Sequence, residues 1–233
     1  MRSARVGIVA ILIASASSTV FAPTPSLASP IDTTNADETV IVYAARGAVT
    51  NIGAGVIVGQ QGGALVIATA AHVIANAIPR VQLDSGAMLN VVEIDRIEGF
   101  DLAVLKTSAY DGRPSLAAFG QPSPGEDVHV WGHRLTQRYV ESQASVSDLD
   151  PTLPEGPADG RFGIDCESCD HGDSGAGVFD ARGRLLGILE GARRDQFGDI
   201  VFVECEPIAP IETALATAAS SKSGRQRSSR RRV

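Results

Sequence analysis

Long apolar runs are nearly absent from this 233-residue sequence, and the one that exists lies at its start. Val6–Ala16 is an apolar run that follows Arg2 and Arg5 and precedes small residues ending at Ser26–Ala28. It is too short to span a bilayer comfortably, and its flanks are typical of a secretory signal. The sequence predicts a signal peptide over residues 1–28, with an uncleaved membrane anchor as the alternative. No later segment has 18 consecutive apolar residues, so we expect an exported protein, periplasmic or extracellular, without a membrane span after signal removal.

Cysteine is scarce as well. The three cysteines are Cys166, Cys169 and Cys205, and export favours a disulfide between two of them. Three pairings are possible, and the sequence does not choose among them. Cys166 and Cys169 lack a second pair at metal-binding spacing, so a zinc site is not expected. Neither a metal nor a cofactor is predicted.

Acidic residues are missing from both ends of the chain. Of the 20 basic residues, two lie in the signal and six in 222–233, so Ser29–Ser221 holds 12 basic and 27 acidic residues. Such an acidic body argues against nucleic acid as the main partner. Residues 220–233 are predicted to be a disordered basic tail, which makes weak electrostatic contacts or is simply solvated without a specific partner.

Alternation of strands with long helices is also lacking, which disfavours a parallel α/β sheet. Short β-branched runs separated by Gly, Pro and Asp turns predict an all-β chain. The expected strands are Thr39–Tyr43, Asn51–Val58, Ala64–Thr69, Arg80–Leu83, Met88–Ile97, Asp101–Lys106, Glu126–Gly132, Tyr139–Ser147, Ala176–Phe179, Leu185–Glu190 and Ile200–Val203. Leu149–Gly160 is expected to be a loop.

The expected strands fall into two halves. Tyr110–Gly125 is rich in Pro, Gly and Ser and predicts a connector, and Pro210–Ala219 predicts a closing helix. The expected domains are residues 29–118 and residues 119–219, the second including that helix.

A serine flanked by glycines stands in the second half, in Gly172–Gly175. Glycines on both sides of Ser174 allow tight backbone conformations and close approach of another molecule. Such a turn suits a nucleophile whose neighbouring N–H groups form an oxyanion hole. Taken alone, the motif is also compatible with an ordinary Gly/Asp/Ser turn.

A base and an orienting carboxylate are available in the first half. Among four histidines, His72 is expected to end a buried strand within Thr69–His72, and Asp101 opens an apolar strand. A partly buried carboxylate needs a partner. His72, Asp101 and Ser174 therefore match the base, orienter and nucleophile of an acyl-transfer triad. If Asp101 does not orient the base, Asp95 is the next candidate.

The order His, Asp, Ser, in Thr69–His72, Asp101–Val104 and Gly172–Gly175, resembles the chymotrypsin (trypsin-like) serine protease family. The spacings of 29 and 73 residues are similar to those of the compact bacterial secreted members. The resemblance extends from about Thr39 to Ala219. It implies two antiparallel six-stranded β-barrels with the active site between them, and a short C-terminal helix.

The resemblance also implies a function, hydrolysis of peptide bonds in proteins or peptides through an acyl-enzyme intermediate. Ser174 would attack, His72 would move the proton, and Asp101 would orient His72. The backbone N–H groups of Gly172 and Ser174 would form the oxyanion hole. One alternative is a catalytically silent binding protein with this fold. Another is a protease-chaperone of the kind that carries a peptide-binding domain after the barrels. It is disfavoured because only 14 residues follow Ala219, too few for such a domain.

Several positions depart from the better-known members. In the animal enzymes, the new N-terminus made at an activation junction pairs with the aspartate before the serine, which is Asp173 here. No such junction follows the signal, so either Asp173 has another donor or its loop stays unformed until something orders it. We expect a pre-formed site. Ser168 stands at the pocket base in place of an aspartate, which argues against Lys or Arg specificity.

Further positions of the implied pocket are His171, Glu190, Gly191 and Ala192. His171 either favours acidic P1 side chains or is an exposed loop residue.

Two more departures concern Glu190 and the cysteines. Glu190 lies where the family has a serine that contacts the triad aspartate. A carboxylate there would repel Asp101 or be held protonated. Cys169 lies near a family disulfide position, and Cys205 is its nearest candidate partner.

Overall fold

The computed structural model describes residues 34–75, 77–134, 137–148, 160–198 and 200–217. All of them belong to one compact unit, Asp32–Val233. The expected signal peptide, the basic tail and most of the Leu149–Gly160 loop lie outside the described residues. No helix within the described ranges is long and apolar enough to cross a membrane.

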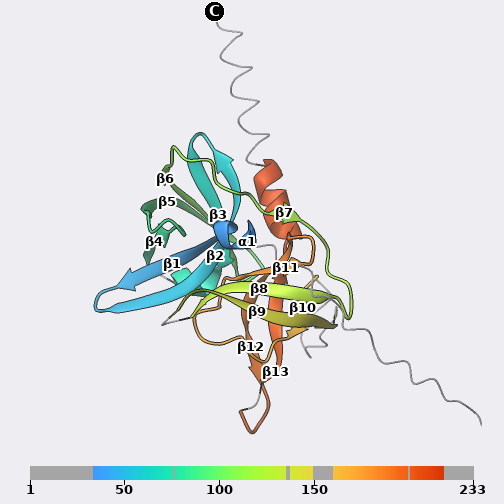
Figure 1. Cartoon of the computed structure of the whole chain (residues 1–233). Helices are drawn as coiled ribbons and strands as arrows, with labels where there is room; N and C mark the ends of the chain where they lie inside the picture. The colour runs from blue at the N-terminus through green and yellow to red at the C-terminus, as the bar shows by residue number, and fades with distance from the viewer. Residues whose placement is uncertain (1–33, 76, 135–136, 149–159, 199, 218–233) are drawn as a thin grey trace, which may run out of the picture. The chain divides into compact units, whose positions relative to one another are not determined.

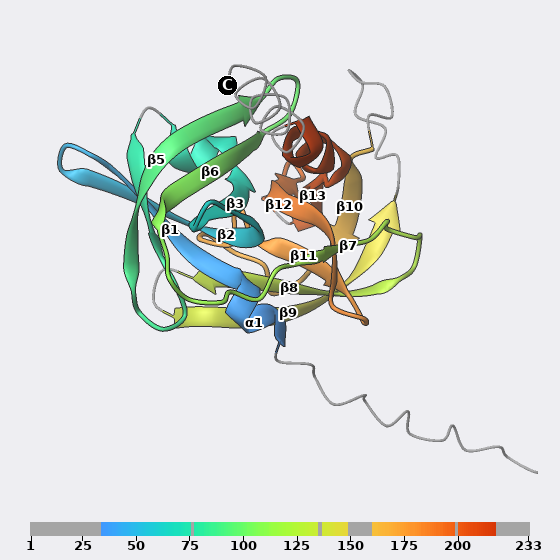
Figure 2. The same cartoon turned by 90° about the horizontal axis from the view of Figure 1, so that it is seen from above.

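The first half of the chain forms a closed antiparallel barrel with the strand order β1-β2-β3-β6-β5-β4 (Figures 1 and 2). Its strands are β1 (Thr39–Arg46), β2 (Val49–Gln61), β3 (Ala64–Ala70), β4 (Ile78–Gln82), β5 (Met88–Ile97) and β6 (Leu102–Ala109). Every residue of β3 is buried, because β3 lies between β2 and β6 and packs on both faces. One face contributes Leu65 and Ile67 to the barrel core, together with Val42 of β1 and Leu105 of β6.

The second half forms another six-stranded barrel. Its strands are β8 (Asp127–Arg134), β9 (Gln137–Asp148), β10 (Phe162–Asp165), β11 (Gly177–Asp180), β12 (Arg184–Arg194) and β13 (Ile200–Pro207). They follow the order β11-β8-β9-β10-β13-β12, and pairing of β11 with β12 closes the ring. The short strand β7 (Ala118–Phe119) adds to β12 in parallel. The predicted two-barrel, all-β fold is confirmed.

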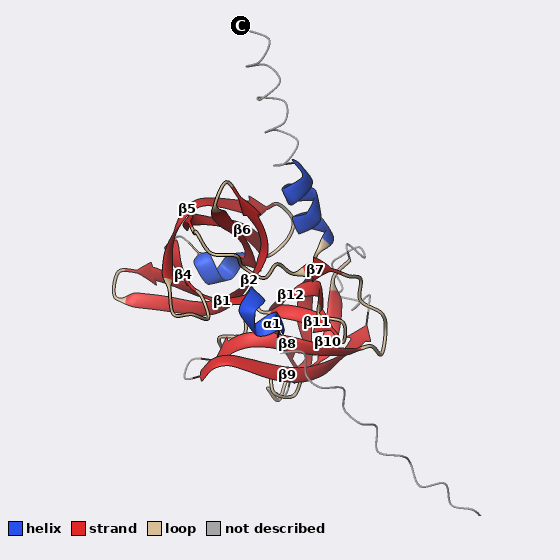
Figure 3. Cartoon of the chain, turned by 45° about the horizontal axis from the view of Figure 1, so that its top comes forward, coloured by secondary structure: helices blue, strands red, loops and turns tan. Residues whose placement is uncertain are grey.

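Helical segments are few in the described part of the chain (Figure 3). They are α1 (Thr34–Glu38), the 3₁₀ helix η1 (Ala71–Ile74) and the helical residues 209–217. The last of these corresponds to the predicted closing helix. One local expectation was wrong: β3 ends at Ala70, so His72 lies on η1 and not at the end of a strand. Residues 162–165, for which no strand was predicted, form strand β10.

A continuous core joins the two barrels. Val56 of β2 and Leu102 of β6 belong to the same buried cluster as Trp131, Phe179 and Ile188 of the second barrel. Burying aliphatic and aromatic side chains of both barrels together removes a large apolar area from water, at about 25 cal/mol per Å². The barrels are therefore held in a fixed relation, and residues on their facing loops keep a defined geometry.

The cysteines pair within one short loop. Cys166 and Cys169 form a disulfide, and Cys205 on β13 is a buried free thiol. The sequence left three pairings open, and Cys205, the nearest family-based candidate, is not the partner of Cys169. The disulfide closes the loop that follows β10 and leads to the serine turn, so it constrains the approach to Ser174.

Candidate active site

His72 is the second residue of η1, which directly follows the buried strand β3. The small residues Ala70 and Ala71 let the chain turn tightly there. The Arg96 guanidinium donates to the carbonyl oxygens of Ala71 and Ile74, at 3.1 and 3.4 Å, and so closes the end of this turn. The His72 side chain is about half exposed, at 49%. It is therefore both fixed at its backbone and accessible to a ligand.

Asp101 holds His72 through several groups at once. Its backbone carbonyl accepts the N–H of Ala71 at 2.9 Å, and its Oδ1 accepts the backbone N–H of His72 at 2.8 Å. Oδ2 forms a short contact with Nδ1 of His72. The structure therefore brings together the predicted base and carboxylate. Asp95, the alternative orienter, is an exposed residue of β5 that instead faces the barrel exterior near Lys106.

The charge state of His72 is set mainly by this partner. The hydrogen bond with Asp101 raises the pKa of His72, burial opposes this shift, and the negative charges of Asp101 and Glu190 raise the pKa further. A carboxylate beside an imidazole favours the imidazolium. The imidazole is thus prepared to accept a proton at Nε2 while Asp101 holds Nδ1.

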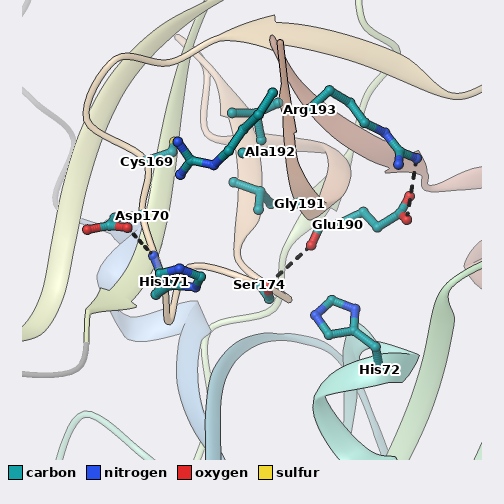
Figure 4. Close-up of a pocket in the computed structure, with 12 residues that line it drawn as sticks. His72, Cys169, Asp170, His171, Ser174, Glu190, Gly191, Ala192 and Arg193 are labelled. Carbon is teal, nitrogen blue, oxygen red and sulfur yellow. Dashed lines mark hydrogen bonds and ion pairs between the residues drawn. The ribbon is translucent and has the colours of Figure 1, made fainter. Parts of the chain in front are cut away.

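Ser174 is anchored to both barrels. Its backbone carbonyl accepts the N–H of Ala54 on β2 at 2.8 Å. Gly175 donates to the carbonyl of Leu189 on β12, also at 2.8 Å. The serine turn thus bridges one strand of each barrel, and this bridge places Ser174 in the same cavity as His72 (Figure 4).

Two glycines make this bridge possible. Gly175 has a φ of +85°, and a Cβ there would lie 2.2 Å from the carbonyl oxygen of Ala54. On the opposite side, a Cβ on Gly53 would lie 2.8 Å from the carbonyl oxygen of Ser174. Both positions need glycine because the two backbones are in direct contact.

Asp173 is buried and closes the turn on itself. Its Oδ2 accepts the backbone N–H of Asp170 at 2.9 Å, and its own N–H donates to the carbonyl of Asp170 at 3.1 Å. Asp173 packs so closely on Gly132 of β8 that a Cβ there would lie 2.3 Å from Oδ1. The sequence left the donor for Asp173 open, and the turn itself supplies one.

The hydroxyl of Ser174 donates to the backbone carbonyl of Glu190 at 3.2 Å (Figure 4). Within the described residues, no hydrogen bond joins it to His72. The backbone N–H groups of Gly172 and Ser174, the expected oxyanion donors, make no hydrogen bond to any described residue. Gly172 has a φ of +102°, a conformation that favours glycine.

A cavity of about 400 Å³ opens beside the serine. Its lining residues are His72, Cys169, Asp170, His171, Ser174, Leu189, Glu190, Gly191, Ala192, Arg193, Arg194 and Val203. Four of the five predicted pocket residues are among them. Ser168 is not: it is exposed in the disulfide loop. His171 is exposed and also lines the cavity, and a preference for acidic P1 side chains stays a prediction.

Glu190 is directed into the site by a β-bulge. The register between β12 and β13 shifts between Leu189 and Gly191, which leaves Glu190 without a paired residue on β13. Bulges of this kind re-aim a side chain and are common beside active sites. Burial, and then the negative charges of Glu204, Glu206 and Asp101, raise the pKa of Glu190 to about 7, while Arg193 lowers it. The carboxyl group is therefore partly protonated near neutral pH.

Four charged side chains in and behind the site were not singled out from the sequence: Arg161, Arg193, Glu204 and Glu206. Glu204 and Glu206 lie on β13 and are 2% and 0% exposed. Arg193 is ion-paired with Glu204 and lies 4.0 Å from Glu190. Arg161 pairs with Glu206, at 3.1 Å. Two acids within an apolar strand were the available signal, because buried charges require partners.

Comparison with known protein families covers the same residues. The family model for the trypsin-like peptidase domain matches residues 53–188, more than half of the chain. That range includes His72, Asp101 and Ser174. No curated protein sequence matches the chain.

Solved structures share the fold at low identity. The serine endoprotease from Yersinia pestis is 24% identical with a TM-score of 0.62, over 81% of this chain and 63% of that one. Rv3671c from M. tuberculosis, in the inactive form of a serine-to-alanine mutant, is 20% identical with a TM-score of 0.62, over 87% and 97%. The HtrA-type protease AlgW, a variant with a tripeptide, is 20% identical with a TM-score of 0.66, over 81% and 61%. This chain thus spans less than two thirds of the length of the first and third structures.

Proposed function

Because the chain belongs to the trypsin-like peptidase family, we propose that it is a secreted serine endopeptidase. It acts on proteins or peptides through Ser174, His72 and Asp101. The observation that carries the proposal is the double engagement of His72 by Asp101, in a cavity that Ser174 also lines. That arrangement supplies a nucleophile, a base and an orienting carboxylate. It needs neither metal nor cofactor.

In the proposed reaction, Ser174 Oγ attacks the carbonyl carbon of the scissile peptide bond, and Nε2 of His72 takes the hydroxyl proton. The tetrahedral intermediate then expels the amine, which receives that proton from His72, and an acyl-enzyme remains. Water attacks the ester by the same route and releases the acid. Asp101 stays ionised throughout and stabilises the imidazolium.

The oxyanion donors in this scheme are the backbone N–H groups of Gly172 and Ser174. Both are unused by the described residues, which leaves them available to a substrate oxygen. One such donor contributes about 3–4 kcal/mol of transition-state stabilisation. Before attack, the Ser174 hydroxyl has to leave the carbonyl of Glu190 and turn to His72, a rotation about a single bond.

The contacts of Glu190 favour a second candidate, a binding protein without catalysis. The Ser174 hydroxyl donates a hydrogen bond to the backbone carbonyl of Glu190. The carboxyl group of Glu190 is also close enough to Asp101 for their negative charges to repel each other. If this state persisted with substrate bound, the cavity would hold peptides without cleaving them. The two candidates differ in the reactivity of Ser174.

A fluorophosphonate probe on the mature protein tests the proposal, with Ser174→Ala as the control. We expect labelling of the wild-type protein and none of Ser174→Ala, together with cleavage of a peptide library. Peptide binding without Ser174-dependent labelling would support the binding protein. Secretion is tested separately, by the N-terminal sequence of the exported protein, which we expect to begin at Ser29.

A further inference from the structure

A buried carboxylate of the second barrel contacts the backbone of Asp101. Oε1 of Glu206, on β13, accepts the N–H of Asp101 at 2.7 Å, and the Glu206 side chain is 0% exposed. The two residues are 105 positions apart in sequence. This hydrogen bond fixes the peptide plane from which the Asp101 side chain extends.

Arg161 completes the contact. Its Nε and Nη2 donate to the two carboxylate oxygens of Glu206, both at 3.1 Å. Nη2 also donates to the carbonyl of Gly99 at 2.9 Å, and the guanidinium lies 5.3 Å from the ring centre of Phe100. Arg161 and Glu206 together therefore contact Gly99, Phe100 and Asp101, the entire turn that leads into β6. We call these two residues the Glu206–Arg161 clamp.

Each polar group of Asp101 therefore has a hydrogen-bond partner. Its side chain and carbonyl hold the first turn of η1, and its N–H is held by Glu206. A shift of this peptide would move the carboxylate away from His72. Misplacement of a catalytic group by about 1 Å can lower a rate by about 10²-fold.

A purely stabilising role explains the clamp less well. Replacing a buried ion pair by apolar residues of similar volume is often neutral or stabilising, so an ion pair is weak evidence for stability. An arginine whose guanidinium binds both a carboxylate and a carbonyl at one turn fixes the geometry of that turn. The clamp is therefore better suited to orienting Asp101 than to stabilising the fold.

We propose that Glu206, held by Arg161, is a positioning residue that orients the Asp101 carboxylate toward His72 from the second barrel, an inference that rests on the proposed function. The clamp makes the triad depend on the contact between barrels as well as on the first barrel.

The test compares Glu206→Leu with Glu206→Gln, because leucine removes the acceptor for Asp101 at similar volume whereas glutamine keeps an oxygen there. We expect Glu206→Leu to lower kcat about 10- to 100-fold with little change in KM, and Glu206→Gln to retain most activity. The matched control is Glu204→Gln, a buried carboxylate on the same strand that pairs closely with Arg193, lies 4.0 Å from Nε of Arg161 and makes no hydrogen bond to Asp101. It should lose an ion pair without losing kcat.

The second readout needs no catalysis. The His72 imidazole is titrated by NMR in a Ser174→Ala, Glu190→Gln background, because Glu204 and Glu206 both act on the charge of Glu190. Weaker contact with Asp101 should then lower the pKa of His72 in Glu206→Leu and leave it unchanged in Glu204→Gln. If Glu206→Leu does not fold, Arg161→Lys decides, because Arg161 is partly exposed and lysine cannot form the fork. It should give a smaller loss of kcat and the same direction of pKa change.

Wild-type kcat and an unaltered His72 titration in folded Glu206→Leu or Arg161→Lys would overturn the positioning role. Failure of the proposed function has a different signature: the wild-type protein then shows no Ser174-dependent labelling, whatever the histidine titration shows.

Discussion

The Asp101 carboxylate engages His72 at two atoms: Oδ1 accepts the backbone N–H of His72 at 2.8 Å, and Oδ2 contacts Nδ1 of the ring. One contact fixes the backbone of η1 and the other fixes the imidazole. The position of the ring and its tautomer therefore depend on the same carboxylate. The side chain of Asp101 is 23% exposed, so the contact is partly shielded from solvent.

Asp101→Asn should lower kcat on the order of 10⁴-fold at neutral pH. Asparagine can keep its oxygen on the His72 N–H, which places its NH₂ group toward Nδ1. The imidazole then carries its proton on Nε2 and cannot take the proton of Ser174. The same substitution should lower the pKa of His72, since Asp101 is the main cause of its rise. Steady-state kinetics and an NMR titration measure the two effects.

Asp95→Asn is the matched control for that substitution. It removes a carboxylate of the same barrel that is exposed on β5, so activity and the His72 titration should both remain as in the wild-type protein. An equal loss in both variants would show that the orienting role of Asp101 is not specific.

The residues of the proposed triad could be selected from the sequence because each lies in a short motif and the three motifs occur in one order. The strands around them were predictable because β-branched runs alternate with Gly and Asp turns. The sequence could not indicate what faces these residues from other elements. The bulge that directs Glu190 into the site depends on strand register, and the contact of Glu206 with Asp101 joins residues 105 positions apart.

The cysteines and β10 illustrate the same limit. Three cysteines allow three pairings, and only the turn after β10 brings Cys166 to Cys169. Residues 162–165 have little strand pattern of their own. They form a strand because β9 and β13 lie on either side and supply hydrogen-bond partners. Tertiary context decides such short segments.

Gly175→Ala should disrupt the serine turn. The new Cβ would lie 2.2 Å from the carbonyl oxygen of Ala54 and 2.5 Å from Oγ1 of Thr69, so the two barrels would have to move apart. We expect destabilisation of about 3 kcal/mol or more and loss of fluorophosphonate labelling. Urea denaturation measures the first effect. Gly47→Ala is the control, because its φ of +62° is similar but nothing lies within 4 Å of the new Cβ. It should cost only about 1 kcal/mol.

Glu190 should make the protein less stable as the pH rises through neutrality. Its pKa is about 7 in the folded protein and near 4.5 in the unfolded chain. Between these values the folded state binds the proton more tightly, so this contribution to stability is present below pH 4.5 and is lost as the pH rises through 7. Allowing for its partial exposure, we expect an effect of about 1–2 kcal/mol.

The measurement is urea denaturation of the wild-type protein and Glu190→Gln at pH 4.5, 6 and 8. Glutamine carries no charge at any of these pH values, so Glu190→Gln should become the more stable of the two as the pH increases. A constant difference between the two proteins would contradict the shifted pKa.

The same carboxyl group should make the choice of P1 residue depend on pH. Glu190 lines the cavity beside Ser174, and it gains negative charge as the pH rises through about 7. A glutamate at P1 is ionised over this range and will be repelled increasingly, whereas a glutamine of the same shape will not.

Deprotonation of His72 affects both substrates alike and cancels in the ratio of their kcat/KM values. That ratio, glutamate over glutamine, should fall about 3- to 10-fold between pH 6 and pH 8. In Glu190→Gln it should stay flat. His171→Ala, which removes another ionisable side chain that lines this cavity, should retain the fall. A flat ratio in the wild-type protein, or a fall that only His171→Ala removes, would exclude Glu190 as its cause.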